Sequence, residues 1–136
     1  HAMISAALLH DVLEDTDFNP EEIEGAMGSR VLRLVQELTD VYTHKAFPNL
    51  NRETRKRMER ERTVQISEEA LLVKLFDLQH NLHDIDLHDK NFARVYRAEK
   101  RKILDEIVRR FETKEPKTVL GLNVLTIASR ALVALH

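Results

Sequence analysis

The scarcity of glycine and proline is the feature that most limits what this chain can fold into. The chain has 3 Gly and 3 Pro in 136 residues, with 43% hydrophobic and 32% charged residues. So few breakers favour long helices joined by short connections. No segment shows the sustained alternation of apolar and polar residues that is typical of a strand. We therefore predict an all-α fold in a single domain over residues 1–136, a length that can bury one sizeable core.

Composition also limits the chemistry. The absence of cysteine excludes disulfides and thiolate metal sites, so any metal must be bound by His, Asp or Glu. The most apolar stretch, residues 118–136, contains Asn123, Ser129 and Arg130, so it predicts a packed helix and not a membrane span. No stretch resembles a signal peptide. We expect a cytoplasmic protein without a membrane partner.

Local signals divide the chain into helices. Asn19 followed by Pro20 and two acids is a strong helix start, and Gly28 breaks that helix before the next. Asn51 is placed to cap a very basic helix. The other predicted helices cover residues 4–14, 67–85 and 92–111 and a final segment after Pro116, with a loop over residues 42–51.

The first candidate site is the stretch "AALLHDVLEDT", in which an apolar run leads directly into a histidine and three acids. On a helix, His10 lies over Glu14 and Asp11 lies over Asp15, because positions four apart share a face. A neutral imidazole with a carboxylate suits Mn, Fe, Zn or Mg. The alternative is a frayed helix end with solvated acids, and this stretch alone favours a metal site only slightly.

The second candidate is the stretch "LVKLFDLQHNLHDID", residues 72–86. Leucines at helical spacing form an apolar seam of Leu71, Leu75, Leu78 and Leu82. Polar residues at spacings of three and four form a separate stripe of Lys74, Asp77, Asn81 and Asp84. Asp77 could be a third metal ligand, with Lys74 and Asn81 holding an anion or a ribose. For this stripe alone, the solvated face of an amphipathic helix is the better interpretation.

Taken together, "AALLHDVLEDT" and "VKLFDLQHNL" resemble the HD-domain metal-dependent phosphohydrolases. The branch they resemble is the hydrolase domain of the RelA/SpoT stringent-response family and its small stand-alone relatives, over residues 4–104. That resemblance implies a helical bundle and a divalent metal cofactor, usually Mn²⁺, with Zn²⁺, Fe²⁺ or Mg²⁺ as other options. It assigns metal ligation to His10, Asp11 and Asp77.

The same resemblance implies further roles. It makes Glu14 and Asp15 the catalytic pair and Asn81 a contact to the nucleotide. Where the family has "KLADRLHN" this chain has "KLFDLQHN", with the bulky Phe76 in place of alanine. That difference bears on substrate specificity more than on metal binding. The first metal histidine of the family lies on a helix upstream of the doublet, so we expect it before residue 1 and expect this stretch alone to bind metal weakly.

Two basic segments are candidates for contact with phosphates. Arg52 and Arg55 begin the basic helix, whose start we expect over the metal cleft, although such a run is usually a solvated face paired with its own glutamates. Tyr96 is the second candidate, together with the nearby cations Arg97, Lys100 and Arg101. Nucleic-acid binding is the weaker option, because the chain has a net charge of -2 and few aromatic residues.

The sequence thus predicts an enzyme that hydrolyses the 3′-diphosphate of a guanosine alarmone or the phosphate of a related nucleotide. The alternatives are another nucleotide phosphatase or phosphodiesterase of the HD class, and a binding or regulatory module with a degenerate HD fold. The expected partner is a small-molecule nucleotide. The sequence leaves the oligomeric state open, including a homo-oligomer, and the role of the last helix.

Overall fold

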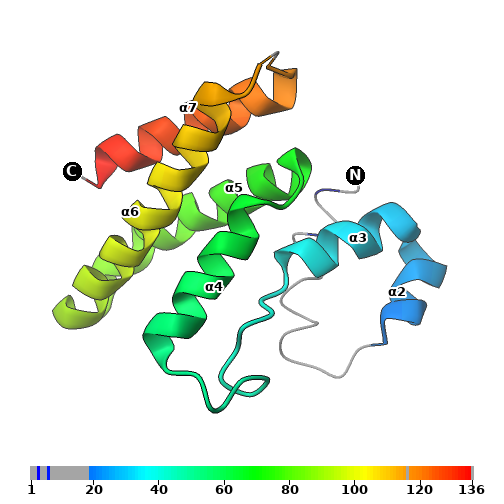
Figure 1. The fold of residues 1–136 in the computed structure, drawn as a ribbon, viewed down its shortest axis with the longest axis horizontal. Coiled ribbons are helices and arrows are strands. Elements are labelled where there is room, and N and C mark those ends of the chain that lie inside the picture. The colour runs from blue at the N-terminus through cyan, green and yellow to red at the C-terminus, as the bar shows by residue number, and fades with distance from the viewer. Residues whose placement is uncertain (1–2, 4–5, 7–18, 116, 136) are drawn as a thin grey trace. The chain divides into compact units, whose positions relative to one another are not determined.

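The computed structural model describes residues 3, 6, 19–115 and 117–135. In these residues all regular structure is helical, which confirms the predicted all-α class (Figure 1). The elements are α2 (Pro20–Met27), α3 (Ser29–Leu38), α4 (Arg52–Val64), α5 (Glu68–Asp84), the 3₁₀ helix η1 (Ile85–Leu87), α6 (Lys90–Thr113) and α7 (Val119–Ala134). Of the helices described, none is both long and apolar enough to cross a membrane.

The chain divides into two compact units, His1–Val73 and Lys74–His136, and the boundary lies within α5. The prediction of a single domain over all 136 residues therefore stays a prediction. The first unit has a core of aliphatic side chains from α3 and the start of α5, among which Leu34, Val35 and Leu71 are fully buried. In the second unit Leu104, Ile107 and Phe111 of α6 are buried, as are Val124 and Ala128 of α7.

Capping residues set most helix ends where the sequence predicts them. The Asn19 side chain accepts a hydrogen bond from the Glu21 backbone N–H at 2.9 Å, which satisfies a free donor at the start of α2. Gly28 has a φ of 92°, a left-handed conformation that glycine adopts without strain, and it separates α2 from α3. α6 begins at Lys90, two residues before the predicted start, because the Asp89 carboxylate accepts from the Asn91 and Phe92 backbone N–H groups.

The cap at the start of α4 gives a direct test of this account. The Asn51 side chain accepts from the Thr54 backbone N–H at 2.8 Å. Replacing Asn51 with alanine should lower the free energy of unfolding by about 1 kcal/mol, because that donor loses its partner at the helix start. Asn49→Ala, in the exposed loop before α4, is the control and should change stability far less. Equal effects in urea denaturation of the two variants would contradict the assignment.

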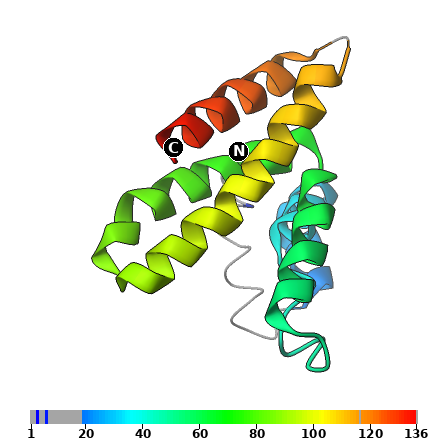
Figure 2. The same cartoon turned by 60° about the vertical axis from the view of Figure 1, so that its left-hand side comes forward.

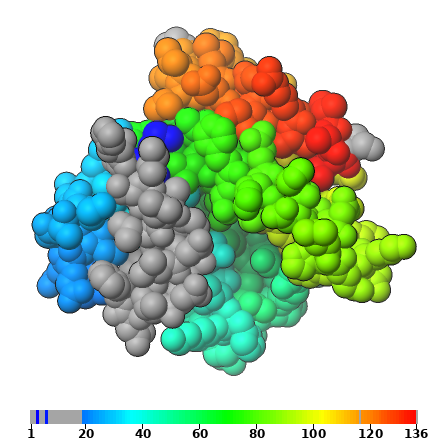
Figure 3. Space-filling model, turned by 180° about the vertical axis from the view of Figure 1, so that it is seen from behind, coloured from blue at the N-terminus to red at the C-terminus, as the bar shows by residue number. Residues whose placement is uncertain are grey.

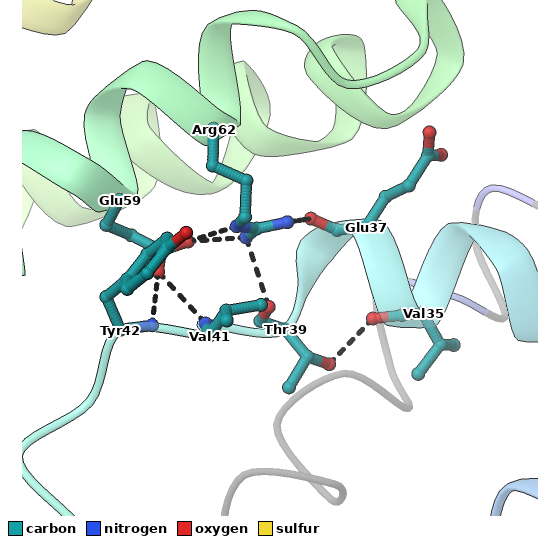
Figure 4. A network of polar contacts seen from close by, with 7 residues as sticks. All are labelled: Val35, Glu37, Thr39, Val41, Tyr42, Glu59 and Arg62. Atoms are coloured by element: carbon teal, nitrogen blue, oxygen red, sulfur yellow. Dashed lines mark hydrogen bonds and ion pairs between the residues drawn. The ribbon is translucent and has the colours of Figure 1, made fainter. Parts of the chain in front are cut away.

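A polar network within the first unit joins α3, the following loop and α4 (Figure 4). Arg62 donates to the Glu37 and Thr39 backbone carbonyls, both at 3.1 Å, and so places a cation at the negative end of α3. Glu59 pairs with Arg62 and accepts from the backbone N–H groups of Val41 at 2.9 Å and Tyr42 at 2.8 Å. The network therefore fixes the loop that leaves α3 against α4.

The second unit is built from antiparallel neighbours. Figures 1 and 2 both show α6 running back from the corner after α5, and α7 returning alongside α6. The corner contains η1, and the space-filling view shows it at the molecular surface (Figure 3). Leu87, within this corner, is 85% exposed. This arrangement places the polar stripe of α5 next to the first turns of α6.

Candidate functional site

α5 carries the described part of the candidate site. The predicted apolar seam is confirmed at Leu71, Leu75 and Leu78, which are buried, while Asp77 on the neighbouring face is half-buried. Asn81 lies one turn further along and donates from Nδ2 to Asp77 Oδ2 at 3.4 Å. The spacing of four residues explains this contact, because such positions share one face of a helix.

Tyr96 of α6 adds a third group beside this pair. Burial raises the pKa of the Tyr96 phenol above 10.0, hydrogen bonding with Asn81 lowers that pKa, and the negative charges of Asp77 and Glu99 raise it. A phenol is already protonated at neutral pH at its ordinary pKa of about 10, and the raised pKa extends that protonation to higher pH, so the O–H of Tyr96 is available as a hydrogen-bond donor. The structure thus brings together Asp77, Asn81 and Tyr96, three residues that the sequence singled out on two separate segments.

An aromatic row extends along α6 from Tyr96. The Tyr96 ring stacks on Phe92 with ring centroids 5.9 Å apart, and Phe92 lies 5.5 Å from the His88 ring. On the other side, Lys100 Nζ lies 5.1 Å from the centroid of Tyr96. These contacts hold the phenol on one side of α6. Sequence reasoning missed Phe92 here, although the repeat of four residues from His88 to Lys100 was the available signal.

The pKa of Tyr96 offers a test of this cluster that needs no metal or substrate. Tyr42→Phe removes the other tyrosine of the chain, so ultraviolet absorbance then follows the Tyr96 phenolate alone. We expect a midpoint above the ordinary value of about 10. Asp77→Asn should lower that midpoint, because it removes a neighbouring negative charge. Asp84→Asn, on the same helix, should leave it unchanged, and an unchanged midpoint in Asp77→Asn would contradict the proximity of Asp77 and Tyr96.

The residues that would hold a metal are only partly described. Asp77 fits the role of a ligand: its carboxylate offers about four lone-pair sites, and the 3.4 Å contact with Asn81 leaves most of that capacity available. The predicted partners His10, Asp11, Glu14 and Asp15 lie outside the described residues, so their roles stay predictions. Over the described ranges alone, no group of three His, Asp or Glu side chains is placed to hold a metal ion.

The other predicted substrate contacts fall into both units. Lys74 is half-buried on α5, one turn before Asp77. Arg52 and Arg55 begin α4 in the first unit, and Arg55 Nε donates to the Leu50 backbone carbonyl at 3.3 Å. Contact of these three cations with substrate stays a prediction. Phe76, the departure from the family motif, is 54% exposed.

The chain has two further His-Asp pairs, His83-Asp84 at the end of α5 and His88-Asp89 just before α6. Asp89 caps α6 as described above, and Asp84 lies 3.8 Å from His80, one turn away on the exposed end of α5. The aspartates of both pairs thus make contacts at helix ends.

The sequence is similar to those of known proteins. The model of a family described as HD domain matches residues 1–112. The chain therefore belongs to the HD-domain family, which confirms the resemblance drawn from the two motifs. It is 44% identical over 84 residues to guanosine-3′,5′-bis(diphosphate) 3′-pyrophosphohydrolase MESH1 of Danio rerio, covering 62% of this chain and 43% of that protein. It is 34% identical over 87 residues to a probable enzyme of the same name from Synechocystis, covering 62% of this chain and 11% of that protein.

The fold is also similar to a solved structure. That protein is described as a metazoan ortholog of SpoT that hydrolyses ppGpp and plays a role in starvation responses. The likeness has a TM-score of 0.65 and 31% sequence identity, and it covers 96% of this chain and 70% of that one. The chain spans 43% of the length of the Danio rerio MESH1 protein and 44% of the human one, to which it is also 44% identical.

Proposed function

We propose that the chain is a metal-dependent hydrolase of guanosine 3′,5′-bis(diphosphate). Water would cleave the 3′ ester bond, releasing pyrophosphate and leaving guanosine 5′-diphosphate. The observation that carries this proposal is the likeness, over 96% of the chain, to a protein described as hydrolysing ppGpp. The MESH1 relatives, which are named for the same reaction, support it independently of the structure.

The proposed metal ligands are His10, Asp11 and Asp77, with Mn²⁺ as the first candidate ion. Their mixture of imidazole and carboxylate donors also suits Zn²⁺, Fe²⁺ and Mg²⁺. A divalent ion bound here would polarise a phosphoryl oxygen and lower the pKa of water. Of these three proposed ligands, Asp77 lies within the described residues, and its side chain is half-buried.

The remaining residues are assigned to water, proton and substrate. Glu14 and Asp15 would orient the attacking water and accept its proton. The Asn81 amide and the protonated phenol of Tyr96 lie beside Asp77 and would donate hydrogen bonds to the substrate near the metal. The cations Lys74, Arg52 and Arg55 would offset the negative charge of the phosphates.

A nucleotide panel with product analysis tests this function. With Mn²⁺ present, a form extended at the N-terminus to supply the expected first histidine should convert guanosine 3′,5′-bis(diphosphate) to guanosine 5′-diphosphate and pyrophosphate in equal amounts, whereas residues 1–136 alone should turn over little. The extended form is the reference for every comparison of turnover. Release of orthophosphate from simple nucleotides, or cleavage of phosphodiesters, would favour another activity of the HD class. Nucleotide binding without turnover would favour the regulatory module. A nucleotide substrate is in keeping with the cytoplasmic location that we also propose.

A further inference from the structure

A basic groove lies on the second unit, on a face of α6 different from that of Tyr96. The groove has a volume of about 520 Å³ and is lined by Asp86, His88, Lys90, Ala93, Arg94, Arg97, Ala98 and Arg101. The lining thus contains four basic side chains, of Lys90, Arg94, Arg97 and Arg101, and one carboxylate, that of Asp86. The cations follow one another at spacings of four, three and four residues, so they form one row along the helix.

The structure separates this row from the cluster around Asp77. Tyr96 lies beside Asn81 and Asp77, whereas Arg97 forms an ion pair with Asp86 in the corner after α5. Arg97 and Asp86 also line a second cavity of about 470 Å³, which reaches Arg130 of α7. The cations near Tyr96 in the sequence therefore serve two different faces of α6.

The groove cations are positioned but only partly neutralised. At the far end of the row, Arg101 donates from Nη2 to the Leu135 backbone carbonyl, which ties its side chain to the end of α7. The Nε–H of Arg101 is buried and has no acceptor among the described residues. Lys90 and Arg94 are exposed, and within the part of the chain that the structure describes their side chains have no hydrogen bond or ion pair.

We propose that this groove binds a small phosphate-bearing anion, with Lys90, Arg94, Arg97 and Arg101 as its contacts. The row from Lys90 to Arg101 is about 16 Å long at the helical rise of about 1.5 Å per residue. That length and the groove volume suit a di- or triphosphate group or a nucleotide. Three of the four cations are arginines, and guanidinium groups bind phosphate oxygens with paired, charge-assisted hydrogen bonds.

Asp86 allows the proposal to predict a gain of anion affinity, which a merely solvated basic face would not show. Its carboxylate pairs with Arg97 inside the groove, so it competes with an incoming anion for that guanidinium. Asp86→Asn should therefore increase anion affinity, by about tenfold if one charge-assisted contact is released. The double variant Lys90→Ala with Arg94→Ala should reduce affinity by at least that factor.

The test is calorimetric titration of the metal-free chain, dialysed free of chelator, with inorganic pyrophosphate. The matched control is Lys102→Ala with Arg109→Ala, two exposed cations of the same helix that do not line the groove. The proposal expects the control to bind as the unaltered chain does, Asp86→Asn to bind more tightly and the groove double variant to bind weakly. Circular dichroism should show equal helix content in all four proteins.

Several results would overturn the proposal. Equal losses in the two double variants would mean that only net charge matters, and weaker binding by Asp86→Asn would mean that Asp86 supports the fold and does not oppose an anion. Absence of pyrophosphate binding in the unaltered chain would exclude the site, and so would tight binding of a single-stranded RNA in preference to pyrophosphate. Since no metal or turnover enters the measurement, it stands or falls separately from the proposed hydrolase function.

Discussion

Replacing Asp77 with asparagine should reduce Mn²⁺-dependent release of pyrophosphate by at least about 100-fold. Loss of an outer-shell partner of a metal typically costs about 10–100-fold in affinity or activity, and loss of a direct ligand should cost at least the upper end of that range. Asparagine keeps the size of the side chain but removes the negative charge that a divalent ion requires. Asp77 is half-buried beside Asn81, which can still donate to the remaining oxygen, so the helix should persist.

Asp84→Asn is the matched control for this variant. It makes the same chemical change on the same helix, at a residue whose described contact is with His80. We expect turnover within about twofold of the unaltered chain, since charge changes at exposed positions have small effects. Equal losses of activity in the two variants would mean that Asp77 acts through general electrostatics and does not bind the metal.

The second large effect should separate the catalytic pair from the ligands near the start of the chain. Asp15→Asn should retain Mn²⁺ binding but lose turnover by at least about 100-fold, because it removes a proton acceptor while keeping the shape of the side chain. Asp11→Asn should instead lose Mn²⁺ binding, because a carboxylate ligand is missing. Isothermal titration with Mn²⁺ and a pyrophosphate-release assay on the same samples distinguish the two. Loss of metal from both variants alike would show that the division into ligand and catalyst is wrong.

Local signals were sufficient for most of the helical framework. Asn19 and Asn51 cap the helices that the sequence assigned to them, because a cap depends on residues only two or three positions away. The predicted start of α6 at residue 92 is two residues late, because the Asp89 carboxylate caps the helix and it begins at Lys90. The contacts of Arg62 with the end of α3 join residues more than twenty positions apart, and no local pattern specifies them.

The candidate site shows the same division between local and distant contacts. The pairing of Asp77 with Asn81 follows from their spacing on one helix, and the sequence identified both. Their proximity to Tyr96 depends on how α6 packs back against α5, so the sequence could nominate Tyr96 but could not join it to Asp77. Adjacent positions of a helix face different directions, so the sequence already separates Arg97 from Tyr96. The ion pair of Arg97 with Asp86, in the corner between the helices, required the structure.

The central claim is that His10, Asp11 and Asp77 bind one divalent ion, although the two motifs lie far apart in the sequence. Its most direct test is a crystal structure of the chain with Mn²⁺, in which anomalous scattering locates the metal. The account predicts one main peak, with donor atoms of all three residues about 2.0–2.3 Å from it. A peak that lacks Asp77 would contradict it, and so would an Asp77 carboxylate more than about twice a hydrogen-bond length from the His10 imidazole.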